Sequence, residues 1–361
     1  MTVAPALSSA LSVLLLVIAV VLPSITSPTV PFGVRIPAEH TNEPAVIRQT
    51  RLYRWRVVVC GIIAAGACVA IYLVTGEYLL LPLSVLAQLG IWYTCFFLAN
   101  HEVRTAKAAG GWYEGVREGI AVDTGLRTDR PRFPWLWLAP SVIITIATAV
   151  VGVLLYPSMP DTLVAHYTAN GVPNRVVAKT VGTAFSLVFV QVGLTALLGG
   201  IAAGIFVRSR ADLDPAHPVS SAHWHRRYML LGAKALLGLV AMIDLGMFGS
   251  ALLKWTGTVT RWQVLVVVLP ILVGVAITIV VLARNNRERD EGEQDTGLTH
   301  RDDDKYWRGG LFYVNREDHA LLVTRRFGVG WTLNFGNPRA ALLLVGVLGL
   351  IALVITLRFT S

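Results

Sequence analysis

Eight long apolar stretches constrain this chain more than any other feature of its sequence. A helix needs about 18 to 20 predominantly apolar residues to cross the hydrocarbon core of a bilayer. Hydrophobic residues make up 54% of the 361 residues and charged residues only 15%, which excludes a soluble globular protein. The sequence predicts an all-α polytopic membrane protein with about eight transmembrane helices. The stretches are residues 6–25, 57–75, 79–99, 136–155, 181–207, 228–253, 263–283 and 340–357.

Basic residues are concentrated on alternate connections between these stretches. Most of the 31 Lys and Arg residues follow the first, third, fifth and seventh stretches. Because basic residues near helix ends accumulate on the cytoplasmic side, we expect a multi-pass protein of the cell membrane with both termini outside. The first stretch lacks a basic region before it and a clear cleavage site after Leu22, so a retained helix is expected. The net charge of +9 follows from this bias and does not indicate a nucleic-acid partner.

The composition divides the chain into four parts. Residues 1–283 are expected to form a seven-helix membrane region. Residues 284–304, dense in charges of both signs, are typical of a flexible cytoplasmic linker. Residues 305–338 are predicted to form a small β-rich cytoplasmic domain, and residues 339–361 the last transmembrane helix and tail.

The predicted β-rich domain has strand-like periodicity. Leu311 to Val314 and Ala320 to Thr324 are short β-prone runs joined by a plausible turn. Between Phe327 and Phe335 the odd-numbered positions are apolar and alternate with small or polar residues. This alternation predicts a strand whose odd-numbered side chains face a core.

A β-unit of this size buries little by itself, so we expect it to pack on the membrane region or at the lipid headgroups. The aromatic residues Trp307, Tyr313 and Trp331 are candidates for this contact. Two roles stay open for the domain. It could tie the last helix to the rest of the bundle, or it could present these residues to a cytoplasmic regulator.

The connection at residues 156–180 carries a polar cluster between two apolar stretches. Pro160 ends the preceding helix, and Asp161 is a candidate N-cap for a short helical turn that ends at Asn170, followed by Gly171. On that turn His166 and Asn170 would share one face. Capping accounts for most of the polar residues. The alternative is an outer-face ligand site that uses Asp161, His166, Asn170 and Lys179.

Asp244 lies near the middle of the sixth apolar stretch. A carboxylate at that depth is costly, which makes it a candidate functional residue by default. Lys234 is ten residues away, about 15 Å along a helix, so it cannot pair directly with Asp244. Three arrangements stay open: a protonated carboxyl, hydrogen bonds to Ser or Thr across helices, or a polar cavity.

The sequence contains no recognisable catalytic or cofactor motif. The three cysteines, Cys60, Cys68 and Cys95, lie inside apolar stretches, where a small buried hydrophobic residue is the usual role. A lone His166 offers no set of metal ligands. We therefore expect neither an enzyme nor a bound metal or cofactor.

Two segments resemble uncharacterised families. Met159-Pro160-Asp161, His166, Gly171-Val172-Pro173 and Lys179 resemble the short signature of domain of unknown function 1648, over roughly residues 140–195. In this chain Leu163-Val164 stand where that family usually has Ile-Pro, and Asn174 where it has Asp. Residues 305–338, with their Arg-Phe-Gly-x-Gly-Trp-Thr-x-Asn-Phe run, resemble a second uncharacterised domain found alongside the first.

The first resemblance implies a bacterial membrane protein related to immunity proteins against the sporulation-delaying peptide toxin. We therefore expect recognition of a peptide or envelope ligand at the outer face, of the immunity or signalling type, and communication with a cytoplasmic partner. The alternative is a proton-coupled transporter or permease component that uses Asp244.

Overall fold

The computed structural model describes the chain except for residues 1–2, 77–79, 122–130, 168–172, 259–262, 285–292, 329, 347–348 and 350–361. Seven described helices are long and apolar enough to cross a membrane. Residues 338–346 begin a further helix at the position of the last predicted stretch. The prediction of a helical multi-pass membrane protein is confirmed. The long helices are α1 (Val3–Ile25), α2 (Pro44–Thr75), α3 (Leu80–Ala109), α5 (Ala139–Leu155), α7 (Ser186–Arg208), α8 (Pro218–Trp255) and α9 (Gln263–Ala283).

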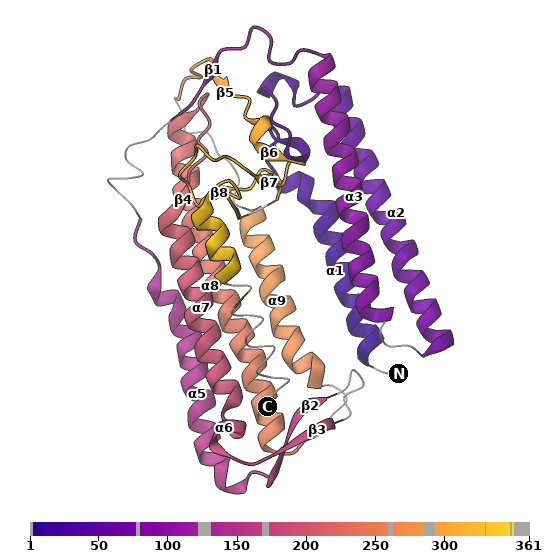
Figure 1. Ribbon diagram of the computed structural model, residues 1–361, viewed down its shortest axis with the longest axis vertical. Helices are drawn as coiled ribbons and strands as arrows, with labels where there is room; N and C mark the ends of the chain where they lie inside the picture. Colours follow the sequence, from indigo (N-terminus) through magenta and orange to yellow (C-terminus); the bar gives the residue numbers. More distant parts are fainter. Residues whose placement is uncertain are drawn as a thin grey trace.

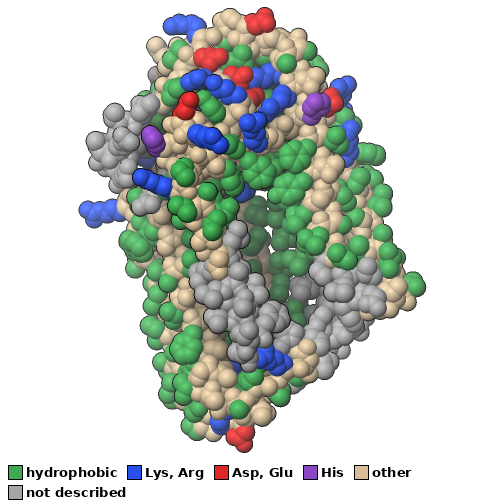
Figure 2. All heavy atoms as spheres, viewed as in Figure 1, with side chains coloured by type: hydrophobic (Ala, Val, Ile, Leu, Met, Phe, Trp, Pro, Cys, Tyr) green, Lys and Arg blue, Asp and Glu red, His purple; other side chains and the backbone are tan. Residues whose placement is uncertain are grey.

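The helices form two groups that lie side by side (Figure 1). Helices α1, α2 and α3 pack against one another, and α8 packs against α5, α7 and α9 in the second group. Figure 2 shows a hollow lined by hydrophobic side chains between the groups, while charged side chains gather at one end. In the first group an aromatic core forms at that charged end, where Phe327 packs on Phe32, Tyr53 and Phe96.

Three helices extend well past their apolar stretches at the charged end. Helix α2 begins at Pro44 and α8 at Pro218, and both prolines occupy the first turn, where a missing N–H costs nothing. Helix α3 continues to Ala109. Among these three helices, Tyr53 of α2 packs on Phe327, and Lys107 of α3 pairs with Asp304.

Short strands from distant parts of the chain meet at the charged end (Figure 1). We call residues 299–337, together with β1 and β4, the strand module. In it β1 and β5 are parallel, β4 and β8 are parallel, β8 and β9 are antiparallel, and β6 and β7 are antiparallel. The small strand element predicted before the last helix is confirmed. The strands are β1 (Glu118–Gly119), β4 (Ser209–Arg210), β5 (Thr299–His300), β6 (Trp307–Arg308), β7 (Phe312–Tyr313), β8 (Leu322–Thr324) and β9 (Trp331–Leu333).

The predicted inward face of residues 327–335 is wrong in part. The strand is confined to Trp331–Leu333, and the buried side chains in this segment include the even-numbered Thr332 and, just after the strand, Asn334. Phe335 is exposed. Asn334 is buried because its side chain accepts from the amides of Asn315 and Gly336 and donates to two carbonyl groups, which closes the loop before β8.

The predicted helical turn after Pro160 is also wrong. Residues Thr162–Tyr167 (β2) and Pro173–Ala178 (β3) form an antiparallel hairpin at the end of the molecule opposite the strand module (Figure 1). Asp161 therefore caps no helix. The nearby helix start belongs to α6 (Val181–Ala184), where Thr180 and Thr183 form a capping box. Short 3₁₀ turns complete the fold at Pro31–Gly33, Ala38–His40, Trp135–Leu138, Tyr156–Ser158 and Asp304–Tyr306.

Candidate functional site

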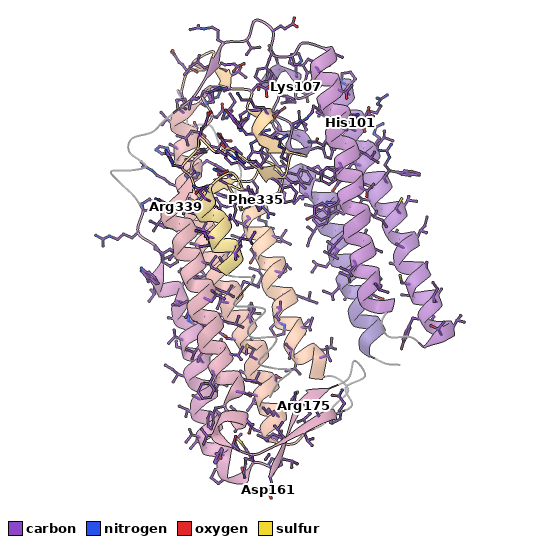
Figure 3. All side chains as sticks on the ribbon, in the orientation of Figure 1. His101, Lys107, Asp161, Arg175, Phe335 and Arg339 are labelled. Carbon is purple, nitrogen blue, oxygen red and sulfur yellow. The ribbon has the colours of Figure 1, made fainter. Side chains whose placement is uncertain are left out.

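The β2–β3 hairpin holds several of the predicted site residues. Figure 3 shows Asp161 and Arg175 at this end of the molecule. His166 pairs with Arg175 across the strands, at a point where the register shifts. Asn170 lies outside the described residues, and the helical turn on which it was expected to share a face with His166 is replaced by β2. On β3, Asn174, Arg175 and Val176 are exposed, and Val176 exposes 59% of its surface.

Lys179 closes the base of the hairpin. Its ammonium donates to the carbonyl oxygen of Met159 at 2.9 Å and lies 3.8 Å from the carboxylate of the exposed Asp161. The ammonium also lies 5.6 Å from the centre of the Tyr156 ring. The structure thus brings Lys179 and Asp161 together. The pair has small energetic value because its carboxylate is fully exposed, while the hydrogen bond to Met159 fixes the hairpin base.

The hairpin rests on the last turns of α8. Leu163 of β2 is almost fully buried and belongs to one apolar cluster with Met159, Ala184 and Trp255. The indole N–H of Trp255 donates to the carbonyl oxygen of Ala184 at 2.9 Å. Lys254 donates to the carbonyl oxygen of Thr183 at 2.6 Å. Movement of the hairpin base would therefore disturb its contacts with the end of α8.

Asp244 lies at the centre of a polar cluster within the second helix group. Its side chain is fully buried, and its Oδ2 accepts hydrogen bonds from Ser141 of α5 and, at 2.9 Å, from Thr195 of α7. Gln191 of α7 donates to the backbone oxygen of Asp244 at 2.9 Å and to Thr148 of α5 at 3.2 Å. Of the three arrangements left open by the sequence, the structure contains the hydrogen bonds across helices.

The other four polar residues of this cluster were not identified from the sequence, although a signal for them exists. Ser141 and Thr148 are seven residues apart on α5, and Gln191 and Thr195 are four apart on α7. Both spacings place two polar side chains on one face of an otherwise apolar helix.

A second buried cluster lies inside the strand module and consists of ion pairs. Asp304 accepts from the backbone N–H of Arg35 at 3.0 Å, from the ammonium of Lys107 at 2.7 Å and from the guanidinium of Arg326. Arg35 also contacts Asp212 at 2.6 Å and Asp303 at 2.9 Å. Figure 3 shows Lys107 at the strand-module end of α3.

The charges in this cluster alter one another's protonation. Burial alone would raise the pKa of Asp304, but the positive charges of Arg326 and Lys107 outweigh burial and hold that pKa below its usual value. Burial, followed by the charge of Arg35, lowers the pKa of His300 to about 4, against the opposing effect of Asp212. His300 is therefore neutral at pH 7, while the carboxylate of Asp304 stays ionised.

The predicted partner-binding residues lie mainly inside the module. Trp307 and Tyr313 are almost fully buried and pack on each other, and the guanidinium of Arg326 lies 4.9 Å from the centre of the Trp307 ring. Both side chains lie within the module, and binding of a cytoplasmic partner by these residues stays a prediction. Trp331 packs on Tyr228 of α8, with ring centres 5.5 Å apart, as expected for a module that rests on the membrane helices.

No group of three or more His, Cys, Asp or Glu residues in the described part of the chain is arranged to hold a metal ion.

Comparison with protein families gives two matches. A model described as domain of unknown function (DUF1648) matches residues 143–192, and one described as a family of unknown function (DUF5808) matches residues 316–340. The first covers α5 from residue 143 onward, the hairpin, α6 and the start of α7, and the second covers β8 and β9. Comparison with curated proteins gives no match, and comparison with solved structures gives none. Both resemblances seen in the sequence are thereby confirmed.

Proposed function

We propose that the chain recognises a peptide or envelope ligand at the β2–β3 hairpin and passes this event through α8 to the strand module. The observation that supports this proposal is that α8 contacts both the hairpin region at one end of the molecule and the strand module at the other. With 38 residues at about 1.5 Å each, the helix spans about 57 Å.

The contacts at the two ends of α8 are specific. At the hairpin end Trp255 and Lys254 donate hydrogen bonds to Ala184 and Thr183. At the module end the hydroxyl of Tyr228 accepts from the backbone N–H of Gly330 at 2.6 Å. A ligand that shifts the hairpin would move one end of a rigid element whose other end contacts β9. A regulator would meet the module through its exposed surface, since Trp307 and Tyr313 are buried.

Exposure of cells to purified secreted peptides tests the recognition step. The panel includes the sporulation-delaying peptide, and cells with and without the chain are compared. Expression of the chain is expected to lower sensitivity to at least one peptide, and Val176→Glu is expected to remove this protection. Ile120→Glu, at a residue of similar exposure in the other end of the molecule, is the matched control and should leave protection intact. Equal sensitivity with and without the chain for every peptide would contradict the proposal.

A proton-coupled carrier is the second candidate, and the buried carboxyl of Asp244 in a membrane-spanning helix supports it. Liposomes that contain the purified chain would then show proton flux that Asp244→Asn abolishes and the exposed control Glu102→Gln preserves. Absence of flux above that of empty liposomes would contradict this candidate.

A further inference from the structure

We propose that Asp244 is a proton-binding site, and that its neutral, protonated form holds α5, α7 and α8 together. The proposal is independent of ligand recognition at the hairpin. It rests on burial, on the unequal hydrogen bonding of the two carboxyl oxygens and on the absence of a nearby cation among the described residues.

The first step concerns charge compensation. The described parts of α5, α7 and α9 contain no titratable side chain except Arg208, at the far end of α7. On α8 the nearest cations are Lys234 and Lys254, each ten residues from Asp244 and therefore about 15 Å along the helix. Lys234 lies 5.7 Å from the centre of the Trp137 ring, and Lys254 donates to Thr183. An ionised Asp244 would have no counter-ion within the described bundle.

The second step concerns the hydrogen bonds. Oδ2 of Asp244 accepts from both hydroxyls, whereas Oδ1 has no hydrogen-bond partner among the described atoms. The side-chain oxygen of Gln191, also fully buried, is likewise without a donor. Both acceptors lie in one buried cluster, and no described residue there neutralises the carboxylate charge. A proton on Oδ1 removes the negative charge and converts an unsatisfied acceptor into a donor.

The third step separates a proton from a metal cation. Ser141, Thr148, Gln191 and Asp244 are each 0% exposed. Helix packing nearby is close, since a Cβ at Gly246 would lie 2.6 Å from the backbone oxygen of Val267. A proton requires no added volume, whereas a bound cation requires room for its oxygen ligands.

The consequence is a linkage between proton binding and helix packing. Burial of a neutral carboxyl in the apolar interface costs no more free energy than burial of any other hydrogen-bonded polar group. Burial of an unpaired carboxylate costs far more. Loss of the proton would therefore favour states in which α5 or α7 separates from α8 and water reaches Asp244.

Infrared spectroscopy of the full chain in lipid bilayers tests the proposal directly. At neutral pH we expect a carbonyl band of a protonated carboxylic acid that shifts when aspartate is labelled with ¹³C at the side-chain carboxyl. Asp244 is the only aspartate in the seven described membrane-spanning helices. The label also marks the aspartates outside these helices, so the variants assign the band. The band should vanish in Asp244→Asn and persist in Glu102→Gln.

Two outcomes would overturn the proposal. The first is that no label-sensitive protonated band appears at neutral pH. The second is that the wild-type chain gains thermal stability with added sodium but not with added choline at equal ionic strength, and that Asp244→Asn removes this gain. That result would assign a sodium ion to the cluster in place of a proton.

Discussion

Replacement of Asp304 by Asn is expected to destabilise the strand module strongly. Asp304 accepts hydrogen bonds from Arg35, Lys107 and Arg326, and the side chains of Lys107 and Arg326 are only 9% and 2% exposed. Removal of one partner from a buried ion pair typically costs about 3–5 kcal/mol, because the other charge stays buried without compensation.

The structure places the expected cost near the lower end of that range. Lys107 keeps Asp302 at 2.8 Å, and Arg326 keeps Asp303 as its partner. Asparagine also keeps one oxygen acceptor in place of the carboxylate. We therefore expect the free energy of unfolding to fall by about 3 kcal/mol.

Equilibrium unfolding of the purified full-length chain in detergent measures this change. Glu317→Gln, at an exposed position of the same module, is the matched control and should change stability by less than about 0.5 kcal/mol. If Asp304→Asn costs no more than the control, the buried network does not stabilise the module, and the argument from its geometry is refuted.

The remaining predictions concern pH, the hairpin and orientation. The pKa of Asp304 is lower in the folded state than in the unfolded chain. Its contribution to stability is therefore complete above the unfolded pKa of about 3.9 and is lost as the pH falls through the lower folded value. Acid titration of unfolding should show this loss in the wild type and a weaker pH dependence in Asp304→Asn. Lys179→Met leaves the carbonyl of Met159 without its donor, so amide exchange in the hairpin should rise in line with a cost of about 1–3 kcal/mol, and unchanged exchange would show that this bond does not fix the hairpin base. Cysteine introduced at Ala165 should be labelled from outside intact cells and cysteine at Ala320 only after lysis; the opposite pattern would invert the proposed orientation.

The helices could be predicted from the sequence because crossing a bilayer demands a long apolar run whatever the tertiary contacts are. The residues at which the helices begin and end could not be predicted in this way. Helices α2, α3 and α8 continue beyond their apolar stretches at the module end, where they pack against the strand module and no longer against lipid alone. Propensity and apolar length do not report such contacts.

The hairpin was missed because its signals are ambiguous. Asn170-Gly171 is compatible with a left-handed helix end and equally with a two-residue hairpin turn. The apolar and β-branched residues on each side of it, such as Val164 and Val176, favour strands, and the described strands β2 and β3 flank that dipeptide.

The two buried clusters differ in how far they could be foreseen. Asp244 stands out in the sequence because a carboxylate within an apolar helix is rare. The Asp304 cluster does not, because Arg35, Lys107, Asp212 and Arg326 come from separate segments, and each reads as an ordinary charge on a connection or helix end. Only the meeting of α1–α3 with the module brings them together.

Hydrogen exchange across the whole chain in lipid nanodiscs tests most directly whether α8 links the hairpin to the strand module. Trp255→Phe removes the hydrogen bond to Ala184 and keeps an aromatic ring, a change worth about 1 kcal/mol. The account predicts faster exchange both near the hairpin base and at the distant amides of β8 and β9, by up to about fivefold for a change of that size. Faster exchange confined to residues 156–188, with β8 and β9 unchanged, would contradict it.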